Sequence, residues 1–293
     1  MAYAVAAYGL WGVFPLYFKA VAHVDIWEVV AHRVIWSLAF LALVLAFQRA
    51  WPQVRAALRS RRGLLTLSAT TLLIAGNWTV FVWAITNHYT LHASLGYYIN
   101  PLVNVLLGYV FLRERLRRVQ LVSVGLAAFG VGYLTLALGQ FPLIALFLAS
   151  TFGLYGMLRK TAPVDALVGL TVETALLAPM ALGLLITRGL GGTLALGHDS
   201  FGTDLLLASA GIVTALPLLW FAQAARRLRL ATMGFIQYLA PTGHFLLAVF
   251  AFRERFDPRA HLVAFAFIWS ALALYSIEAA FWTRRPAAVA PPE

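Results

Sequence analysis

The chain has 293 residues, of which 62% are hydrophobic and 11% charged, and its mean hydropathy is +0.82. A water-soluble domain carries about 25% charged residues, so this composition excludes that class and indicates a membrane protein. The net charge of +11 does not indicate nucleic-acid binding, because the arginines stand in short clusters between apolar runs, as in cytoplasmic loops. The lack of cysteine excludes a disulfide framework and thiolate chemistry.

Apolar runs of about 20 residues, each long enough to cross a bilayer, recur along the whole chain and predict an all-α polytopic membrane protein with ten transmembrane helices. In chain order the predicted spans are 2–21, 26–47, 64–86, 91–112, 119–138, 141–158, 166–187, 204–225, 230–252 and 260–282. The first span has no basic region or cleavage site before it, so we expect it to be retained. The proline-rich tail 283–293 is expected to be disordered and cytoplasmic.

Most lysines and arginines fall on one side of these spans. That side carries Arg49, Arg55, Arg59, Arg61, Arg62, Arg113, Arg115, Arg117, Arg118, Arg159, Lys160, Arg226, Arg227, Arg229, Arg284 and Arg285. The other side carries Lys19, Arg188, Arg253, Arg255 and Arg259, and Arg33 lies inside a span. An excess of basic residues marks the cytoplasmic side of a membrane protein, so we expect both termini in the cytoplasm.

One stretch of the sequence recurs in similar form. YYINPLVNVLLGYVFLRERL begins at residue 97 and QYLAPTGHFLLAVFAFRERF begins at residue 237, and the offset of 140 residues also relates Asp25 to Asp165. Each half contains five predicted spans, so the second half must enter the membrane from the opposite side. We therefore predict two inverted five-helix repeats, 1–140 and 141–282, with a substrate site between them near the membrane midplane, as in many secondary transporters.

Four prolines lie inside predicted spans, namely Pro15, Pro101, Pro217 and Pro241. A proline removes one backbone hydrogen bond and kinks a helix, and the freed carbonyl needs a partner from protein or a wet cavity. These positions are candidates for gating hinges, and simple packing kinks are the alternative interpretation.

Two long segments resemble one transporter family. GNWTVFVWAITNHYTLHASLGYYINPLVNVLLGYVFLRERL (76–116) and ALPLLWFAQAARRLRLATMGFIQYLAPTGHFLLAVFAFRERF (215–256) resemble the RarD-type branch of the EamA-like drug/metabolite transporter superfamily, as do AHRVIWS (31–37) and VETALLAP (172–179). The resemblance covers nearly the whole chain and implies a bacterial-type inner-membrane carrier of ten helices in two inverted repeats. The sequence begins almost directly in the first predicted span, where relatives usually have a short leader, and the resemblance does not fix a substrate.

Ionisable side chains inside spans are costly and are candidates for a functional site. His32 and Arg33 lie in the second span and Glu173 in the seventh, and the 140-residue offset relates Arg33 to Glu173. These two residues are predicted either to form an ion pair between the halves or to bind substrate, with Arg33 holding a carboxylate through its planar fork. A permanent structural ion pair is the competing interpretation, and Glu173 is also a candidate proton carrier.

Amides and aromatic rings complete the candidate substrate site. Amides offer donors and acceptors, and Trp and Tyr offer flat walls with a polar edge, which suits a small amphipathic metabolite better than a bare ion. The candidates are Asn77, Trp78, Trp83, Tyr97, Tyr98, Asn100, Gln237 and Tyr238. Core packing remains the alternative for each aromatic residue.

The leading hypothesis is a secondary transporter that exports a small amphipathic metabolite or drug-like solute, with amino acids favoured, by alternating access. No P-loop, tight metal-ligand cluster or serine-nucleophile motif occurs, so we expect no cofactor, no metal and no ATP-driven step. The alternative is a membrane-embedded enzyme on a lipid-linked substrate, for which His88 and His92 are the isolated candidates. Gly125, Gly130 and Gly132 permit close helix packing, either between the repeats or in a homodimer.

Overall fold

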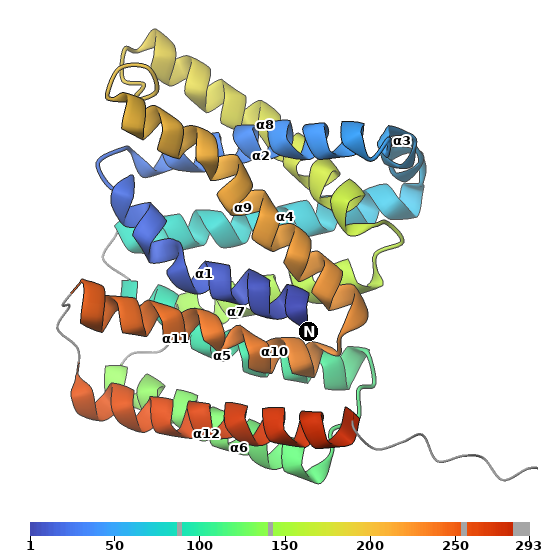
Figure 1. The fold of residues 1–293 in the computed structure, drawn as a ribbon, viewed down its shortest axis with the longest axis vertical. Coiled ribbons are helices and arrows are strands. Elements are labelled where there is room, and N and C mark those ends of the chain that lie inside the picture. The colour runs from blue at the N-terminus through green and yellow to red at the C-terminus, as the bar shows by residue number, and fades with distance from the viewer. Residues whose placement is uncertain (87–89, 140–142, 253–256, 284–293) are drawn as a thin grey trace, which may run out of the picture.

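The structure is a computed structural model that describes residues 1–86, 90–139, 143–252 and 257–283, and these residues form helices and turns without strands (Figure 1). The helices are α1 (Ala2–Ala20), α2 (Ile26–Phe47), α3 (Trp51–Arg59), α4 (Arg61–Thr86), α5 (Thr90–Phe111), α6 (Arg118–Leu138), α7 (Leu143–Thr161), α8 (Ala166–Leu190), α9 (Phe201–Arg227), α10 (Leu230–Gln237), α11 (Leu239–Leu246), the π-helical turn η1 (Leu247–Ala251) and α12 (Pro258–Thr283). Glu254 and the tail after Thr283 lie outside the described residues.

Among the described residues, 7 helices are long and apolar enough to cross a membrane: α2, α4, α6, α7, α8, α9 and α12. The other three predicted spans are also helical, but each misses this standard for a physical reason. Lys19 and several Tyr and Trp residues lower the hydropathy of α1, and the apolar part of α5 is the shorter segment Leu95–Phe111. The ninth span is divided into α10 and α11, which meet at Tyr238.

Aspartates begin two of the long helices. Asp25 accepts the backbone N–H groups of Trp27 and Glu28 at the start of α2, and Asp165 accepts that of Leu167 at the start of α8. These caps satisfy N–H groups that the first helical turn leaves without partners. The two aspartates are 140 residues apart, so the recurrent Val-Asp pair in the sequence is a recurrent helix start.

The arginine-rich segment between the second and third predicted spans contains a helix of its own. In α3, Pro52 stands in the first turn, where its missing N–H costs no hydrogen bond, and Val54 and Ala57 are buried. These two residues pack in a cluster with Leu67 of α4 and Leu167 of α8. The segment is therefore an amphipathic helix that packs against α4 and α8.

Small residues let some helices approach closely. A Cβ atom on Gly243 of α11 would lie 2.8 Å from the Cα of Gly12 in α1, and one on Gly211 of α9 would overlap the backbone of Trp36 in α2. The pairs α1–α11 and α2–α9 are therefore in backbone contact, as is common in membrane helix bundles. Figure 1 shows α6 and α12 side by side along one edge of the bundle and α2 and α8 at the far edge, with α9 running obliquely from that edge toward the middle.

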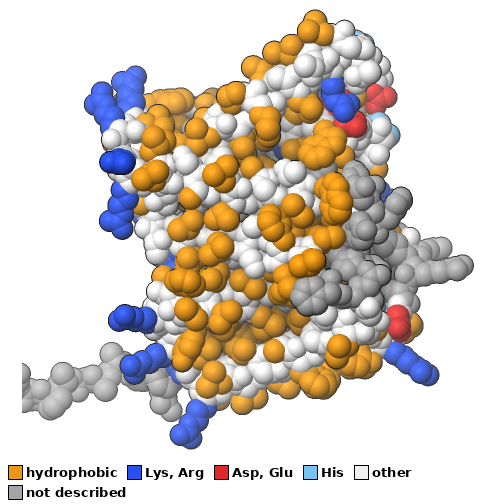
Figure 2. All heavy atoms as spheres, turned by 180° about the vertical axis from the view of Figure 1, so that it is seen from behind, with side chains coloured by type: hydrophobic (Ala, Val, Ile, Leu, Met, Phe, Trp, Pro, Cys, Tyr) orange, Lys and Arg blue, Asp and Glu red, His pale blue; other side chains and the backbone are white. Residues whose placement is uncertain are grey.

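Charge is distributed unevenly over the two ends of the helices. Figure 2 shows apolar side chains over the flank of the bundle, with most Lys and Arg side chains along one edge. The exposed arginines of that edge, called here the arginine-rich end, are Arg49, Arg55, Arg59, Arg61, Arg62, Arg113, Arg115, Arg118, Arg226, Arg227 and Arg229. The turns 21–25 and 191–200 form part of the opposite end.

The prolines differ in their effect on the helices. Pro15, Pro101 and Pro217 lie inside α1, α5 and α9, each of which continues past its proline as one helix. Pro241 follows the junction of α10 and α11 at Tyr238. Because proline has no N–H and its ring crowds the carbonyl four residues before it, the break at this point is expected.

Glu114 connects two helices at the arginine-rich end. Its carboxylate accepts the N–H groups of Leu230 at 3.0 Å and Ala231 at 3.3 Å, which begin α10, and lies 3.8 Å from Nζ of Lys160. Helix α10 has no side-chain cap from its own N-cap residue, Arg229. Glu114, which follows α5, therefore caps the start of α10.

We predict that Glu114→Ala lowers the free energy of unfolding by about 0.5–2 kcal/mol, the usual effect of removing a helix cap. Glu114→Gln should lose less, because its amide oxygen can still accept one N–H group. Thermal unfolding of the detergent-purified protein measures both changes. Equal stability of the wild type and Glu114→Ala would contradict the capping role.

Candidate functional site

Arg33 of α2 lies among polar and aromatic partners without an acidic one. Its Nε donates to Oγ1 of Thr214 at 3.0 Å, and its guanidinium carbon lies 5.0 Å from the ring centroid of Trp78 and 5.3 Å from that of Phe18. Such cation–π contacts stabilise a desolvated guanidinium. Among the described residues no carboxylate lies within ion-pair distance of Arg33. The guanidinium therefore keeps the capacity to bind an anionic group.

Arg33 lines a small cavity that five helices surround. The cavity has a volume of about 20 Å³, and α2, α4, α7, α8 and α9 contribute its walls. Its polar or aromatic lining includes Arg33, Ser37, Trp78, Tyr155, Glu173, Thr174 and Thr214. A cavity of this size holds about one water molecule, so a solute can enter only if these helices separate.

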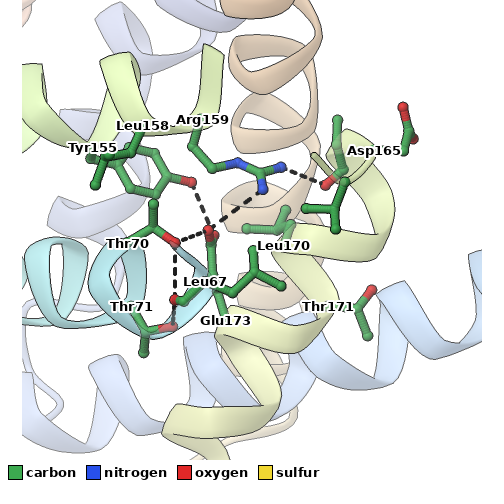
Figure 3. Close-up of polar contacts among 12 residues, drawn as sticks. Leu67, Thr70, Thr71, Tyr155, Leu158, Arg159, Asp165, Leu170, Thr171 and Glu173 are labelled. Carbon is green, nitrogen blue, oxygen red and sulfur yellow. Dashed lines mark hydrogen bonds and ion pairs between the residues drawn. The ribbon is translucent and has the colours of Figure 1, made fainter. Parts of the chain in front are cut away.

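Glu173 of α8 is a buried carboxylate with three partners (Figure 3). Thr70 donates to Oε1 at 2.6 Å, Tyr155 donates to Oε2 at 3.2 Å, and Nη1 of Arg159 lies 3.6 Å from Oε1. Arg159 is itself only 1% exposed and donates through Nη2 to the carbonyl of Ala166 at 2.9 Å. These contacts join α4, α7 and α8 and compensate the buried charge.

The cationic partner of Glu173 is thus not Arg33, which was the partner under the ion-pair alternative. Arg33 and Glu173 line the same cavity, but among the described residues the ion pair of Glu173 is formed by Arg159. The sequence assigned Arg159 to a loop because the apolar run ends at residue 158. The helix α7 continues to Thr161, so Arg159 stays within the bundle.

The amides Asn100 and Gln237 lie in a second polar group, here called the amide cluster, between α1, α5, α7 and α10. Asn104 donates to Oδ1 of Asn100 at 3.0 Å and to Oε1 of Gln237 at 2.9 Å. Tyr8 donates to Gln237 at 3.4 Å, and Asn100 donates to the carbonyl of Ala149 at 2.7 Å. Asn104 was not among the predicted site residues, although it follows Asn100 by one helical turn, which places both on one face.

The remaining candidates are divided between the helix contacts and the surface. Asn77 donates to the carbonyl of Leu148 and to Thr151, both at 2.8 Å, and joins α4 to α7. The Tyr97 ring lies 5.6 Å from the His244 ring. Trp83 is 46% exposed and does not line the cavity.

Two further candidates are buried away from the cavity. The hydroxyl of Tyr238 donates to the carbonyl of Tyr98 at 3.3 Å, across the 140-residue offset. His32 is buried beside Glu28 and also does not line the cavity. His88, a candidate of the enzyme hypothesis, lies outside the described residues, as does the side chain of His92.

Comparison with known proteins decides the family. Residues 1–136 match the EamA-like transporter family. An uncharacterized transporter of Vibrio cholerae is 46% identical over 275 residues, which cover 94% of this chain and 91% of the relative. Protein RarD of Salmonella typhi is 46% identical over 283 residues, which cover 96% of each chain.

The chain belongs to the RarD branch of the EamA-like transporters. It is a multi-pass membrane protein and a membrane transporter, and the predicted family is confirmed. A crystal structure of a protein superimposes with a TM-score of 0.71 at 19% identity and covers 96% of this chain and 97% of that one. At this identity the likeness concerns the fold alone.

In this RarD-type transporter an aromatic block contacts both the cavity and the amide cluster. The block consists of Tyr8, Trp11, Phe152, Tyr155 and Phe221. Tyr155 stacks on Phe221 with ring centroids 5.9 Å apart, and Tyr8 meets Phe221 edge-on at 6.2 Å. Tyr155 also binds Glu173 and Tyr8 also binds Gln237, so the block contacts both polar groups.

We predict that Arg159→Met lowers the free energy of unfolding by about 3–5 kcal/mol, because it leaves Glu173 buried without its cation. The double variant Arg159→Met, Glu173→Leu should recover most of that loss, because no charge then remains in the apolar interior. Unfolding of both variants and of Glu173→Leu alone gives the coupling energy. Purely additive losses would contradict a coupled ion pair.

Proposed function

We propose that this chain is a secondary transporter that exports a small amphipathic metabolite or drug-like solute, with amino acids the favoured class, by alternating access. One observation carries the proposal: the guanidinium of Arg33, without a carboxylate partner among the described residues, lines the same cavity as Glu173 and Trp78. Opposite charges and an aromatic wall in one cavity fit a zwitterion with an apolar side chain.

The recognition chemistry follows from these three side chains. The Nε atom of Arg33 is engaged by Thr214, which orients the fork and leaves the Nη atoms to bind a carboxylate. Trp78 supplies a flat apolar wall. Glu173 supplies negative charge for an ammonium group, because its contact with Arg159 at 3.6 Å is longer than a hydrogen bond.

Several observations support two inverted repeats, 1–140 and 141–282. The helix starts Ile26, Arg61, Thr90 and Arg118 each lie 140 residues before another helix start, at Ala166, Phe201, Leu230 and Pro258. The start of α2 pairs with the end of α8 through Asp25 and Arg188, so these counterparts are antiparallel. Arg117 before α6 likewise pairs with Glu278 near the end of α12.

We infer that the arginine-rich end faces the cytoplasm of a bacterial-type inner membrane, following the positive-inside rule. The start of α1 and the end of α12 belong to it: Arg227 lies over the Tyr3 ring, and Arg117 forms an ion pair with Glu278. The opposite end, with the turns 21–25 and 191–200, then faces outward.

Alternating access requires the cavity to widen, since its present volume of about 20 Å³ admits no metabolite. The aromatic block that contacts the cavity and the amide cluster must then repack. Pro217 beside the cavity on α9 and the broken helix before Pro241 supply the candidate hinges. In the opened state we expect further side chains to become accessible to the substrate, namely His32, Asn77, Tyr97, Tyr98, Asn100, Gln237 and Tyr238. Trp83 would contact the substrate farther out.

A homodimer through α6 is a further proposal. Of the three glycines, Gly130 packs against Ala264 of α12, whereas a Cβ atom on Gly125 or Gly132 would meet no atom within 4 Å. Gly125 and Gly132 therefore leave room on the outer face of α6 for a second copy.

We predict that an amino acid at about 100 times its Kd stabilises the wild type by roughly 2.7 kcal/mol and that Arg33→Ala, still folded, loses this stabilisation. Thermal unfolding against amino acids, nucleosides, sugars and chloramphenicol measures it. Arg33→Lys should bind more weakly than the wild type, because an ammonium lacks the bidentate fork.

The matched control is Arg118→Ala, which removes an exposed arginine away from the cavity and should keep the full shift. A ligand shift that persists in Arg33→Ala would refute the proposed role of Arg33. Failure of that variant to fold would identify Arg33 as a structural residue instead.

A further inference from the structure

A second group of buried ionisable side chains lies on α2 near the opposite end of the bundle. Glu28 is 1% exposed and His32 is 2% exposed, and they are one helical turn apart on the helix that also carries Arg33. Neither residue lines the cavity of Arg33. The two residues therefore need a separate physical explanation.

The carboxylate of Glu28 holds the turn between α8 and α9. Oε1 accepts the backbone N–H groups of Ala195 at 2.8 Å and Leu196 at 3.3 Å. Oε2 has no hydrogen-bond partner in the described part of the chain, and Nη1 of Arg188 lies 3.9 Å from it. The better partner of Arg188 is Asp25, at 2.7 Å from Nη2.

The imidazole of His32 lies beside this carboxylate with both ring nitrogens unsatisfied. Nε2 is 3.7 Å from Oε1 of Glu28, and neither Nδ1 nor Nε2 has a hydrogen-bond partner among the described residues. Buried polar atoms in proteins are nearly always paired, so three unpaired atoms on two adjacent side chains indicate a site that lacks something.

The charges show what is lacking. Asp25 and Glu28 share the single guanidinium of Arg188, so a neutral His32 leaves one negative charge uncompensated. The surrounding elements add carboxylates: Asp204 of α9 accepts the N–H group of Gly197, and Asp199 pairs with His23. The hydrogen bond from Thr203 holds the pKa of Asp199 below its ordinary value, so Asp199 stays charged near neutral pH. One added positive charge would balance Asp25, Glu28 and Arg188, and the further carboxylates favour its binding.

We infer that Glu28 and His32 together bind a proton, and that this proton controls how firmly the turn 191–200 is held against α2. The proton comes from water at the opposite end and is carried on the imidazole, while Glu28 remains a carboxylate.

Proton binding changes the contacts of one oxygen. Oε1 of Glu28 already accepts two N–H groups, and a protonated His32 turns Nε2–H toward the same atom. A carboxylate oxygen accepts about two good hydrogen bonds, so an imidazolium directed at Oε1, which lies 3.7 Å from Nε2, competes there with the N–H groups of the turn. Uptake of the proton therefore loosens the turn between α8 and α9, two helices that line the cavity.

The coupling of this proton to transport rests on the proposed function. In that cycle, a proton taken up at the opposite end would promote opening of the cavity toward that end. The proton site itself does not depend on which solute is carried. It can be tested without a substrate.

The test uses the absence of cysteine from the chain. Ala195→Cys places one thiol on the turn, and its rate of reaction with a membrane-impermeant maleimide is measured on the full-length, detergent-purified protein between pH 5 and 8, where imidazoles change charge. The rate is also measured for the same thiol in a Glu28→Gln background. Dividing the first rate by the second removes the pH dependence of the thiol itself. We expect the ratio of the two rates to change about tenfold over this range, as for losing one hydrogen bond to a charged group. A constant ratio would overturn the proposal.

A second background keeps the proposal testable if Glu28→Gln does not fold. His32→Gln retains the carboxylate and removes the imidazole, so its labelling should lose the pH response of the wild type. A full response in His32→Gln would exclude the pair as the proton site. His23→Gln, which removes the exposed histidine beside Asp199, should keep the response, and its loss there would assign the proton to the outer pair instead.

The outcome is separable from that of the proposed function. Arg33→Ala should leave the pH response of the thiol unchanged, whereas Glu28→Gln, which is not among the proposed binding residues, should leave ligand stabilisation in place. Failure of ligand binding with an intact pH response would refute only the substrate site, and the reverse would refute only the proton site.

Discussion

The compensation of buried charge organises the interior of this transporter. Glu173 lies in a bundle whose outside is apolar, and its carboxylate depends on Thr70 of α4, Tyr155 of α7 and Arg159, also of α7. Removing a charge from water costs several kcal/mol unless charged and hydrogen-bonding partners replace the solvent. The three helices must therefore keep their relative positions near Glu173, and this fixed region forms one wall of the cavity that Arg33 lines.

Arg33 depends on the same constraint but meets it differently. Its charge is balanced by the Thr214 hydroxyl and the faces of Trp78 and Phe18, which stabilise a cation without neutralising it. A carboxylate from outside can improve this environment, whereas an ammonium group at Glu173 must compete with Arg159. The two charges of the cavity thus have different roles: Glu173 is largely committed to the bundle and Arg33 is available.

Most of the long helices were predictable to within a few residues because apolar run length and breakers determine them; the predicted span 26–47 coincides with α2, whereas α3 and the division of the ninth span were not predicted. The partners of the polar side chains were not predictable. The 140-residue offset brings Arg33 and Glu173 to equivalent positions, but it does not determine which cation reaches Glu173. That depended on Arg159 staying in α7, a continuation of one helical turn past the apolar run. Glu28 escaped notice because it stands near a helix start, where a glutamate is ordinary, and only the folded turn 191–200 buries it.

The capping of α10 by Glu114 has a consequence for the order of biosynthesis. The first two N–H groups of α10 are satisfied by a carboxylate that belongs to the other half of the chain. When the ribosome has completed only the first half, Glu114 can be hydrated at the membrane surface, but its docking site does not yet exist. The second half, in turn, contains a helix whose first turn stays open until it meets the first half. Neither half is a finished folding unit, so insertion of the separate helices can proceed one by one, whereas consolidation of the bundle waits for the ninth span.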